Sequence, residues 1–388
     1  MKPTIGVLFG GKSVEHEVSI ISAIQTISAI DQTKYDVIPV YIAKSGCWYT
    51  SDLLANIDNF KNIDSLLEKC IKCAVLQDGV QAVLHRIPSS RFKNNILGKI
   101  DVAFPVMHGT CGEDGTLQGY LEMSGLPYVG CNVLSSSVGM DKVVTKTILK
   151  SENLPVLDHI WFYSVNVQTQ IDKTITAIEN KFKYPLIVKP ANLGSSVGIS
   201  TASNKFELEE ALDLASTFSR KILIEPKVEN LQEINCSVLG DYEHCEASIC
   251  EEPVRTDEIL SFKDKYLAGN KSKGMSNLKR KIPADISQEM SKDIQHLAKQ
   301  AFQALDCSGV SRIDFLIDKS EGAIYINEIN TIPGSLSFYL WEPTGIGFTE
   351  LTTKLIDLAF KRSRENIKLT FSFDTNLLSM RGKSGSKL

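Results

Sequence analysis

The sequence predicts an α/β protein whose C-terminal half changes to α+β organisation, and three observations carry this prediction. In the first third, apolar runs at 5–9, 35–42 and 102–107 alternate with helical patterns, which is typical of a doubly wound parallel sheet with helices on both faces. In the last third, strand patterns at 311–317 and 323–327 are joined by a polar turn. The composition, with 43% hydrophobic and 23% charged residues, is ordinary for a globular protein.

Charge and cysteine content exclude several classes of protein. A formal net charge of -4 argues against a general nucleic-acid binder. No apolar run approaches the roughly 20 residues that a membrane helix needs, and the N-terminus leads directly into the first predicted strand instead of a signal peptide. The 9 cysteines are an odd number scattered through apolar runs, which favours reduced thiols. We therefore expect a cytoplasmic protein without a nucleic-acid or membrane partner.

Two glycine-containing loops follow strands of the predicted parallel sheet. The strand at 5–9 ends in two glycines at 10–11, and the strand at 102–107 ends in His-Gly at 108–109. Because ligands bind beyond the carboxyl ends of parallel strands, these loops are expected to face one site. Glu15 opens the next helix, where an acid either interacts with the helix dipole or pairs with a substrate ammonium. The Gly-x-Gly-x-x-Gly order is absent, which argues against a nicotinamide oxidoreductase.

The middle of the chain carries a lysine and a loop that together predict a phosphate site. We expect a helix from 141, a strand at 186–190, a glycine- and serine-rich loop at 192–198, a helix at 205–216 and a strand at 222–225. Lys189 ends an apolar strand, a costly position unless the lysine is paired or reaches a phosphate. Taken alone, the loop is equally consistent with an ordinary turn and with a phosphate site. Beside Lys189 and a metal site, its consecutive backbone N–H groups favour phosphate binding.

Acids and an amide in the last third predict a metal site. We expect strands at 233–239 and 244–251, a helix at 287–305, strands at 311–317 and 323–327, and a helix at 349–361. Strand periodicity places Arg312 and Asp314 on one face, and Glu328 and Asn330 on one face of the next strand. If these strands pair, three oxygen ligands that suit Mg²⁺ converge beside an arginine ready for a phosphate or oxyanion. The alternative is a solvated surface hairpin, but the flanking apolar residues favour half-buried strands.

Five ordered motifs make the chain resemble the D-alanine–D-alanine ligase family over about residues 3–362. They are FGGKSVEHEVS at 9–19, HGTCGEDGTLQG at 108–119, MDK at 140–142, VKPANLGSSVG at 188–198, and RID at 312–314 with NEINTIPG at 327–334. The resemblance implies an ATP-grasp fold of three domains. The expected divisions are an N-terminal substrate domain at 1–138, a central ATP-grasp subdomain at 139–224, a C-terminal subdomain at 225–365 and a flexible tail at 366–388.

The resemblance also implies site roles by position. The roles in ATP binding fall on Lys142, Lys189, Ser196, Glu225, Val228 and Glu233. The metal-binding roles fall on Asp314, Glu328 and Asn330. The metal is normally two Mg²⁺ ions, with Mn²⁺ as an alternative. Those for the first D-alanine fall on Glu15 and His108, and those for the second on Ser337, Tyr339 and Leu340. Catalytic roles fall on Glu15, Ser195, Tyr266, Arg312 and the backbone N–H of Gly334, the last two stabilising an oxyanion.

The reaction that the resemblance implies passes through an acyl phosphate. One D-alanine carboxylate attacks the γ-phosphate of ATP, and the amine of a second D-alanine then displaces phosphate to give the dipeptide for peptidoglycan synthesis. A lid must exclude water from this intermediate. By analogy the family also implies a homodimer.

Departures from the family pattern leave alternatives open. In the lid stretch at 260–266 only the final Lys-Tyr pair survives, and Tyr266 favours an amine as second substrate. The basic stretch at 271–281 favours a solvated loop over phosphate contact. Tyr339 stands where the family has a serine for the second substrate's carboxylate, so a D-alanine–D-serine ligase or another mixed ligase is an alternative. Remoter alternatives are an ATP-grasp carboxylase and a catalytically inactive nucleotide-binding protein.

Overall fold

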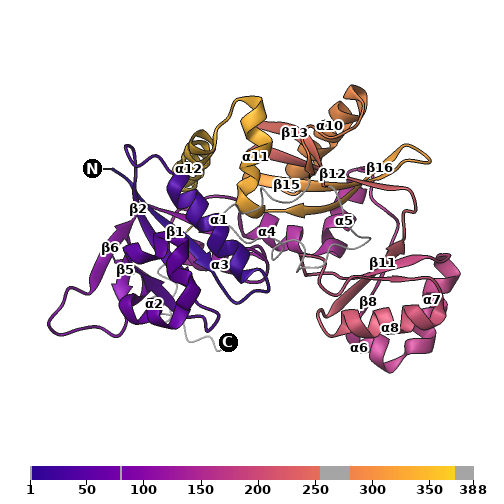
Figure 1. Cartoon of the computed structure of the whole chain (residues 1–388), viewed down its shortest axis with the longest axis horizontal. Helices are drawn as coiled ribbons and strands as arrows, with labels where there is room; N and C mark the ends of the chain where they lie inside the picture. Colours follow the sequence, from indigo (N-terminus) through magenta and orange to yellow (C-terminus); the bar gives the residue numbers. More distant parts are fainter. Residues whose placement is uncertain (1, 79–80, 254–279, 372–388) are drawn as a thin grey trace, which may run out of the picture.

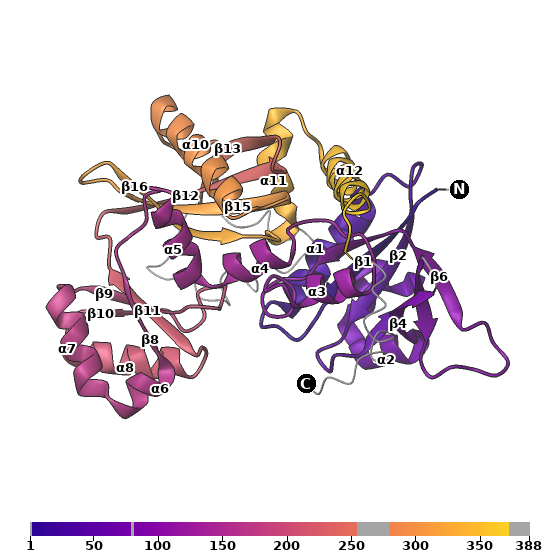
Figure 2. The same ribbon diagram turned by 180° about the vertical axis from the view of Figure 1, so that it is seen from behind.

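Three sheets, each with its own helices, make up the fold. The computed structural model describes residues 2–78, 81–253 and 280–371. The N-terminal sheet and the small sheet of the middle of the chain lie at opposite ends of the molecule, and the C-terminal sheet spans the region between them (Figures 1 and 2). Helices α4 (Val133–Met140) and α5 (Lys142–Ser151) connect the two ends beneath that third sheet.

The N-terminal sheet has seven strands in the order β6-β5-β4-β3-β2-β1-β7. Its strands are β1 (Thr4–Gly10), β2 (Asp36–Ile42), β3 (Trp48–Thr50), β4 (Ile71–Asp78), β5 (Gln81–Arg86), β6 (Ile96–Ile100) and β7 (Val102–Val106). Its helices are α1 (His16–Ala29), α2 (Ile63–Lys69) and α3 (Thr116–Met123), with 3-10 turns η1 (Asp52–Ala55) and η2 (Ile57–Asn62).

The parallel sheet expected from the sequence is confirmed only around β1. Strands β2 and β7 pair with β1 in parallel, whereas β3 to β6 extend the sheet in antiparallel fashion. The extension was not predicted because its strands lack long apolar runs. β4, for example, buries only Cys73 and Val75 among its eight residues.

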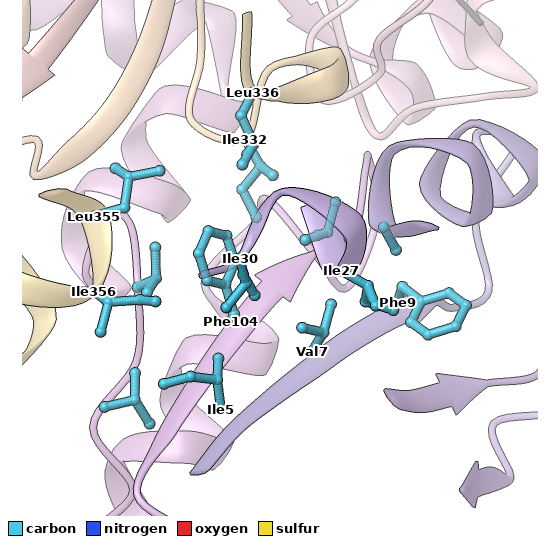
Figure 3. Close-up of a cluster of buried hydrophobic side chains, with 14 of the residues drawn as sticks. Ile5, Val7, Phe9, Ile27, Ile30, Phe104, Ile332, Leu336, Leu355 and Ile356 are labelled. Carbon is cyan, nitrogen blue, oxygen red and sulfur yellow. The ribbon is translucent and has the colours of Figure 1, made fainter. Parts of the chain in front are cut away.

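Two faces of the N-terminal sheet are covered, and one cover comes from the far end of the chain. Leu8 packs toward helix α3, while Ile5 and Phe9 face the opposite layer, which contains α1 and α12 (Phe348–Asn366). Figure 3 shows Ile332 and Leu336 in this same core. The turn that contains Gly334 is thereby held against the N-terminal sheet.

The middle of the chain forms a four-stranded antiparallel sheet in the order β10-β9-β11-β8. Its elements are β8 (Ile160–Tyr163), α6 (Ser164–Thr169), α7 (Ile171–Lys181), β9 (Leu186–Pro190), β10 (Ser200–Ala202), α8 (Lys205–Ser216) and β11 (Lys221–Pro226). Lys189 lies on β9 and Glu225 on the neighbouring β11.

The C-terminal sheet is antiparallel, with the order β14-β13-β12-β15-β16. Its elements are β12 (Leu231–Gly240), β13 (Cys245–Pro253), β14 (Arg280–Lys281), α10 (Gln288–Ala304), β15 (Gly309–Asp318) and β16 (Ala323–Asn330), followed by η4 (Gly334–Ser337), α11 (Phe338–Trp341), η5 (Glu342–Thr344) and α12. Ile234, Cys236 and Phe315 pack with α10 on one face. The intervening residues therefore point to the opposite face.

Among the described residues, no helix is both long and apolar enough to cross a membrane.

Buried His16 links the first glycine loop to strand β2. Its Nδ1 lies 2.6 Å from the carbonyl oxygen of Gly11, and its Nε2 lies 2.9 Å from the hydroxyl of Tyr41. The imidazole is fully buried, and this burial lowers the pKa of His16 below the ordinary 6.5.

We predict that His16 makes the protein less stable in acid. Because the folded-state pKa of His16 lies below the unfolded value of 6.5, its contribution is present above that pH and is lost as the pH falls below it, by up to about 1.4 kcal/mol per pH unit. His16→Gln should therefore show a smaller loss of unfolding free energy between pH 7.5 and 5.5 than the wild type in urea denaturation. Exposed His244→Gln should keep the wild-type slope, and an unchanged slope in His16→Gln would contradict the prediction.

Candidate active site

A pocket lies where the N-terminal sheet, helix α5 and strand β16 meet. Its lining includes Glu15, Glu113, Lys142, Gly194, Glu328 and Asn330. These residues come from segments far apart in the sequence. Residues expected to bind an amino-acid ammonium, a phosphate and a metal therefore share one pocket.

Strand register explains how the acids of the C-terminal sheet come together. Glu251 is paired with Asn235, Asn235 with Asp314, and Asp314 with Glu328, so four polar residues form a row across β13, β12, β15 and β16. A register shift beside Asp314 leaves Asn327 as an extra residue on β16. Bulges of this kind redirect side chains. Here Asn327 accepts a hydrogen bond from Lys189 at 3.1 Å while the adjacent Glu328 contacts Lys142.

Arg312 and Asp314 form a bidentate pair on this face. The Nε and Nη2 atoms of Arg312 lie 2.6 and 2.7 Å from the two carboxylate oxygens of Asp314, and Asn330 Nδ2 donates to Asp314 at 3.1 Å. Burial opposes the charge of Arg312, but the Asp314 carboxylate outweighs it and raises the pKa of Arg312 well above its usual range. The hairpin is therefore a partly buried charged site, and the solvated-hairpin alternative is wrong.

The predicted metal ligands lie next to one another. Asp314 and Glu328 are direct partners on adjacent strands, and Asn330 follows two residues later. Each carboxylate forms an ion pair with a basic side chain. Asp314 pairs with Arg312, and Glu328 pairs with Lys142 at 3.0 Å. Hard oxygen donors that already stabilise positive charge fit Mg²⁺. No group of three histidine, cysteine or acidic side chains placed for a metal occurs in the described ranges, so an amide must complete this set.

Three lysines pair with two glutamates, Lys142 with Glu328 and both Lys146 and Lys189 with Glu225. Lys142 Nζ donates to the carbonyl oxygen of Leu193 at 2.9 Å, at the start of the glycine–serine loop. Lys189 contacts Asn327 and also pairs with Glu225, whose second oxygen lies 3.2 Å from Lys146 Nζ. The Glu225 side chain is only 1% exposed and pairs with the two lysines, contacts that its expected role in ATP binding did not include. Lys146 was not predicted as a site residue.

The glycine–serine loop reaches the first glycine loops. Ser195 donates a hydrogen bond to Glu15, and both Ser195 and Ser196 have left-handed backbone conformations, with φ of 55° and 59°. Gly109 also has a left-handed φ of 72°, and a Cβ atom there would lie 2.7 Å from Glu15 Oε2. The expected convergence of the loops is confirmed, and Glu15 lies at their meeting point.

His108 and Glu113 connect this meeting point to the C-terminal turn. The His108 imidazole contacts the carbonyl oxygen of Ile332 at 2.8 Å and the Ser22 hydroxyl at 3.0 Å, so both ring nitrogens are engaged within the protein. Glu113 accepts from the backbone N–H groups of Gly109 at 2.8 Å and Ile332 at 2.9 Å. Burial and the nearby Glu15 raise the pKa of Glu113 to about 8. Glu113 lies within the motif at 108–119, but it was not predicted as a site residue.

The residues expected at the second substrate are only partly accessible. Ser337 and Leu340 are fully buried, after a turn in which Ser335, Leu336 and Ser337 all have left-handed φ values. The Tyr339 hydroxyl instead donates to Glu251 Oε1 at 3.0 Å, and the Arg280 guanidinium stacks 4.1 Å from its ring.

Other predicted residues lie at the edges of the site or outside it. Val228 is in the turn between β11 and β12, and Glu233 is on β12, on the same face as Asn235. Gly334 begins the turn after β16. Tyr266 and most of the basic stretch at 271–281 lie outside the described residues.

Comparisons with known proteins agree along the whole chain. Residues 4–131 match the family model for the D-ala D-ala ligase N-terminus, and residues 148–357 match that for the C-terminus. The chain is 42% identical to the D-alanine–D-alanine ligase of Thermosipho melanesiensis over 97% of this chain and 98% of that protein, and 42% identical to that of Acetivibrio thermocellus over 95% and 98%.

Solved structures are similar over the same extent. The D-alanine–D-alanine ligase of Coxiella burnetii matches with a TM-score of 0.78 and 30% identity, covering 95% of this chain and 96% of that one. The VanG D-Ala:D-Ser ligase of Enterococcus faecalis matches with a TM-score of 0.77 and 33% identity, covering 92% and 100%.

Glu113→Gln tests the link between the two backbone segments. The amide nitrogen of glutamine cannot accept a hydrogen bond, so one of the N–H groups of Gly109 and Ile332 should lose its acceptor. We expect the unfolding free energy to fall by about 1–3 kcal/mol in urea denaturation. Glu350→Gln, at an exposed i,i+4 pair with Lys354, should change it by less than about 0.5 kcal/mol. Equal stability of the two variants would contradict the role of Glu113.

Proposed function

The chain belongs to the D-alanine–D-alanine ligase family and joins two D-alanines with ATP, and we propose that the pocket around Glu15, Lys142 and Glu328 is where it does so. One observation carries this assignment: an acid placed for a substrate ammonium lines the same pocket as the lysine and oxygen donors placed for ATP and its metal. The three-sheet architecture is the ATP-grasp fold of its structural relatives.

Each part of the pocket supports one binding role. Glu15, fixed by Ser195 beside Gly109, supports binding of the first D-alanine's ammonium. Lys142 and Lys189, with the N–H groups of the loop that contains Ser196, support binding of ATP phosphates. Val228 and Glu233, beyond the end of β11, are proposed for the nucleoside, and Glu225 is proposed to act through the lysines.

Asp314, Glu328 and Asn330 would hold Mg²⁺, which neutralises phosphate charge when bound. The proposed number of ions is two, with Mn²⁺ as an alternative. In this arrangement Arg312 and Lys142, which pair with the two carboxylates, are the protein's own cations beside the transferred phosphate. The oxygen donors of Asp314, Glu328 and Asn330, which lie on adjacent strands, support the proposed binding of Mg²⁺.

The proposed reaction has two steps. The carboxylate oxygen of the first D-alanine attacks the γ-phosphorus of ATP, the bond to the β-phosphate oxygen breaks, and an acyl phosphate and ADP result. The amine of the second D-alanine then attacks the acyl carbon, loses a proton, and expels phosphate to leave the dipeptide. Arg312, on β15, and the N–H of Gly334, at the start of the turn after β16, are proposed to stabilise the oxyanion. Tyr266 is proposed to close the site from the lid.

D-Alanine is the proposed second substrate, in preference to D-serine. The relatives at 42% identity are D-alanine–D-alanine ligases, whereas the D-Ala:D-Ser ligase is 33% identical. We further propose that the protein is a cytoplasmic homodimer that supplies dipeptide for peptidoglycan synthesis, on the strength of the family resemblance.

The reaction is tested by measuring phosphate release and product mass with ATP, Mg²⁺ and D-alanine alone. We expect one phosphate for each D-alanyl-D-alanine formed. The variant Lys189→Met should lose at least about 10-fold in kcat/KM for ATP, because a charge-assisted phosphate contact contributes at least about 1.4 kcal/mol. Phosphate release that requires D-serine or a hydroxy acid would overturn the choice of second substrate.

Tyr339→Phe tests the proposed second-substrate position. The change removes the hydroxyl that Glu251 accepts but keeps the ring beneath Arg280. We expect KM for the second D-alanine to rise by about 10-fold, equivalent to one lost hydrogen bond, while KM for ATP stays the same. Exposed Tyr242→Phe is the matched control. If only KM for ATP rises, the assignment of Tyr339 to the second-substrate position is wrong.

A further inference from the structure

Three buried charges form a chain at the base of the site. Lys146 Nζ lies 3.2 Å from one oxygen of Glu225, and Lys189 Nζ pairs with the other oxygen. The Lys146 and Glu225 side chains are each 1% exposed, whereas the Lys189 side chain is 8% exposed and also contacts Asn327 of β16. The chain of charges thus runs from Lys146 in the interior to the less buried Lys189, which is proposed to bind the phosphates.

The position of Lys146 follows from the geometry of helix α5. Lys142 and Lys146 are four residues apart and so lie on one helix face. Lys142 reaches Glu328 on β16, while Lys146 reaches Glu225 on β11. One helix face therefore supplies lysines to two sheets, and only the outer lysine lines the pocket. The position of Lys146 argues against direct contact with a ligand.

Charge balance gives Lys146 a purpose that direct contact would not. Burying a carboxylate is costly unless it is paired, and a single lysine suffices to neutralise it. If Lys189 were the sole partner of Glu225, the pair would be neutral and would attract a phosphate weakly. Burial lowers the pKa of Lys146, while the adjacent Glu225 carboxylate opposes this effect. When Lys146 is protonated, two lysines share one carboxylate, and the group carries one net positive charge at its more exposed end.

We propose that Lys146 is a positioning residue for ATP binding: it occupies one oxygen of Glu225 so that the positive charge of Lys189 remains available to the phosphates. This inference rests on the proposed function, because it assumes that Lys189 binds ATP. Lys146 itself does not touch the nucleotide. Its effect on ATP is exerted entirely through Glu225 and Lys189.

The test measures the dissociation constant of a non-hydrolysable ATP analogue with the full-length protein by calorimetry. Lys146→Met leaves Glu225 with Lys189 alone and should weaken binding at least 10-fold. The conservative variant Lys146→Arg keeps a positive charge beside Glu225 and should bind within 3-fold of wild type. Lys150→Met, on the same helix with a 69% exposed side chain, should leave binding unchanged.

Two results would overturn the inference. Lys146→Met could bind the analogue as tightly as wild type, or Lys146→Arg could bind as weakly as Lys146→Met, which would mean that the positive charge at this position does not support ATP binding. If Lys146→Met does not fold, Lys146→Gln, which is also uncharged but keeps hydrogen-bonding groups, takes its place in the comparison with Lys146→Arg. Wild-type protein that binds no analogue and makes no dipeptide would instead overturn the proposed function.

Discussion

The alternation of side chains along β12, β15 and β16 is the constraint on which the site depends. Apolar residues such as Ile234 and Phe315 must face α10 to build a core, and this requirement sends Asn235 and Asp314 to the opposite face. A shift of one residue in register would bury the charges and expose the core. The same hydrophobic packing that stabilises the sheet therefore also sets the positions of its polar groups.

Charged groups on that face are then satisfied by one another. Asp314 is held by Arg312, Glu328 by Lys142, and Glu225 by two lysines. Unpaired, such groups would be strongly destabilising in a partly buried setting. Binding of ATP and a metal would therefore exchange one set of partners for another, with basic groups turning from carboxylates to phosphates. In such a site the charged residues are already gathered before ligands bind, while the ion pairs between them can still rearrange.

Local sequence patterns predicted the strands of the site and the convergence of their side chains. The period of two around Arg312 and Asp314 was sufficient, because both faces of β15 are clearly distinguished. Contacts that depend on tertiary packing were missed. In the sequence alone, Lys146 cannot be distinguished from any other helical lysine, because its partner Glu225 lies on a distant strand. The direction of Asn327 depends on a β-bulge, and no residue type in the strand predicts that bulge. Strands β3 to β6 were not predicted because half-exposed strands such as β4 have weak apolar patterns.

The packing of α12 onto the N-terminal sheet has a consequence for how the protein is made. Ile5 and Phe9 share a core with Leu355 and Ile356, so strand β1 lacks part of its cover until helix α12 leaves the ribosome (Figure 3). Glu15 likewise waits for the loop at Ser195 and the turn after Asn330. A nascent chain would thus complete its pocket only after the residues up to α12 have been translated, and apolar surface exposed before that point favours chaperone binding.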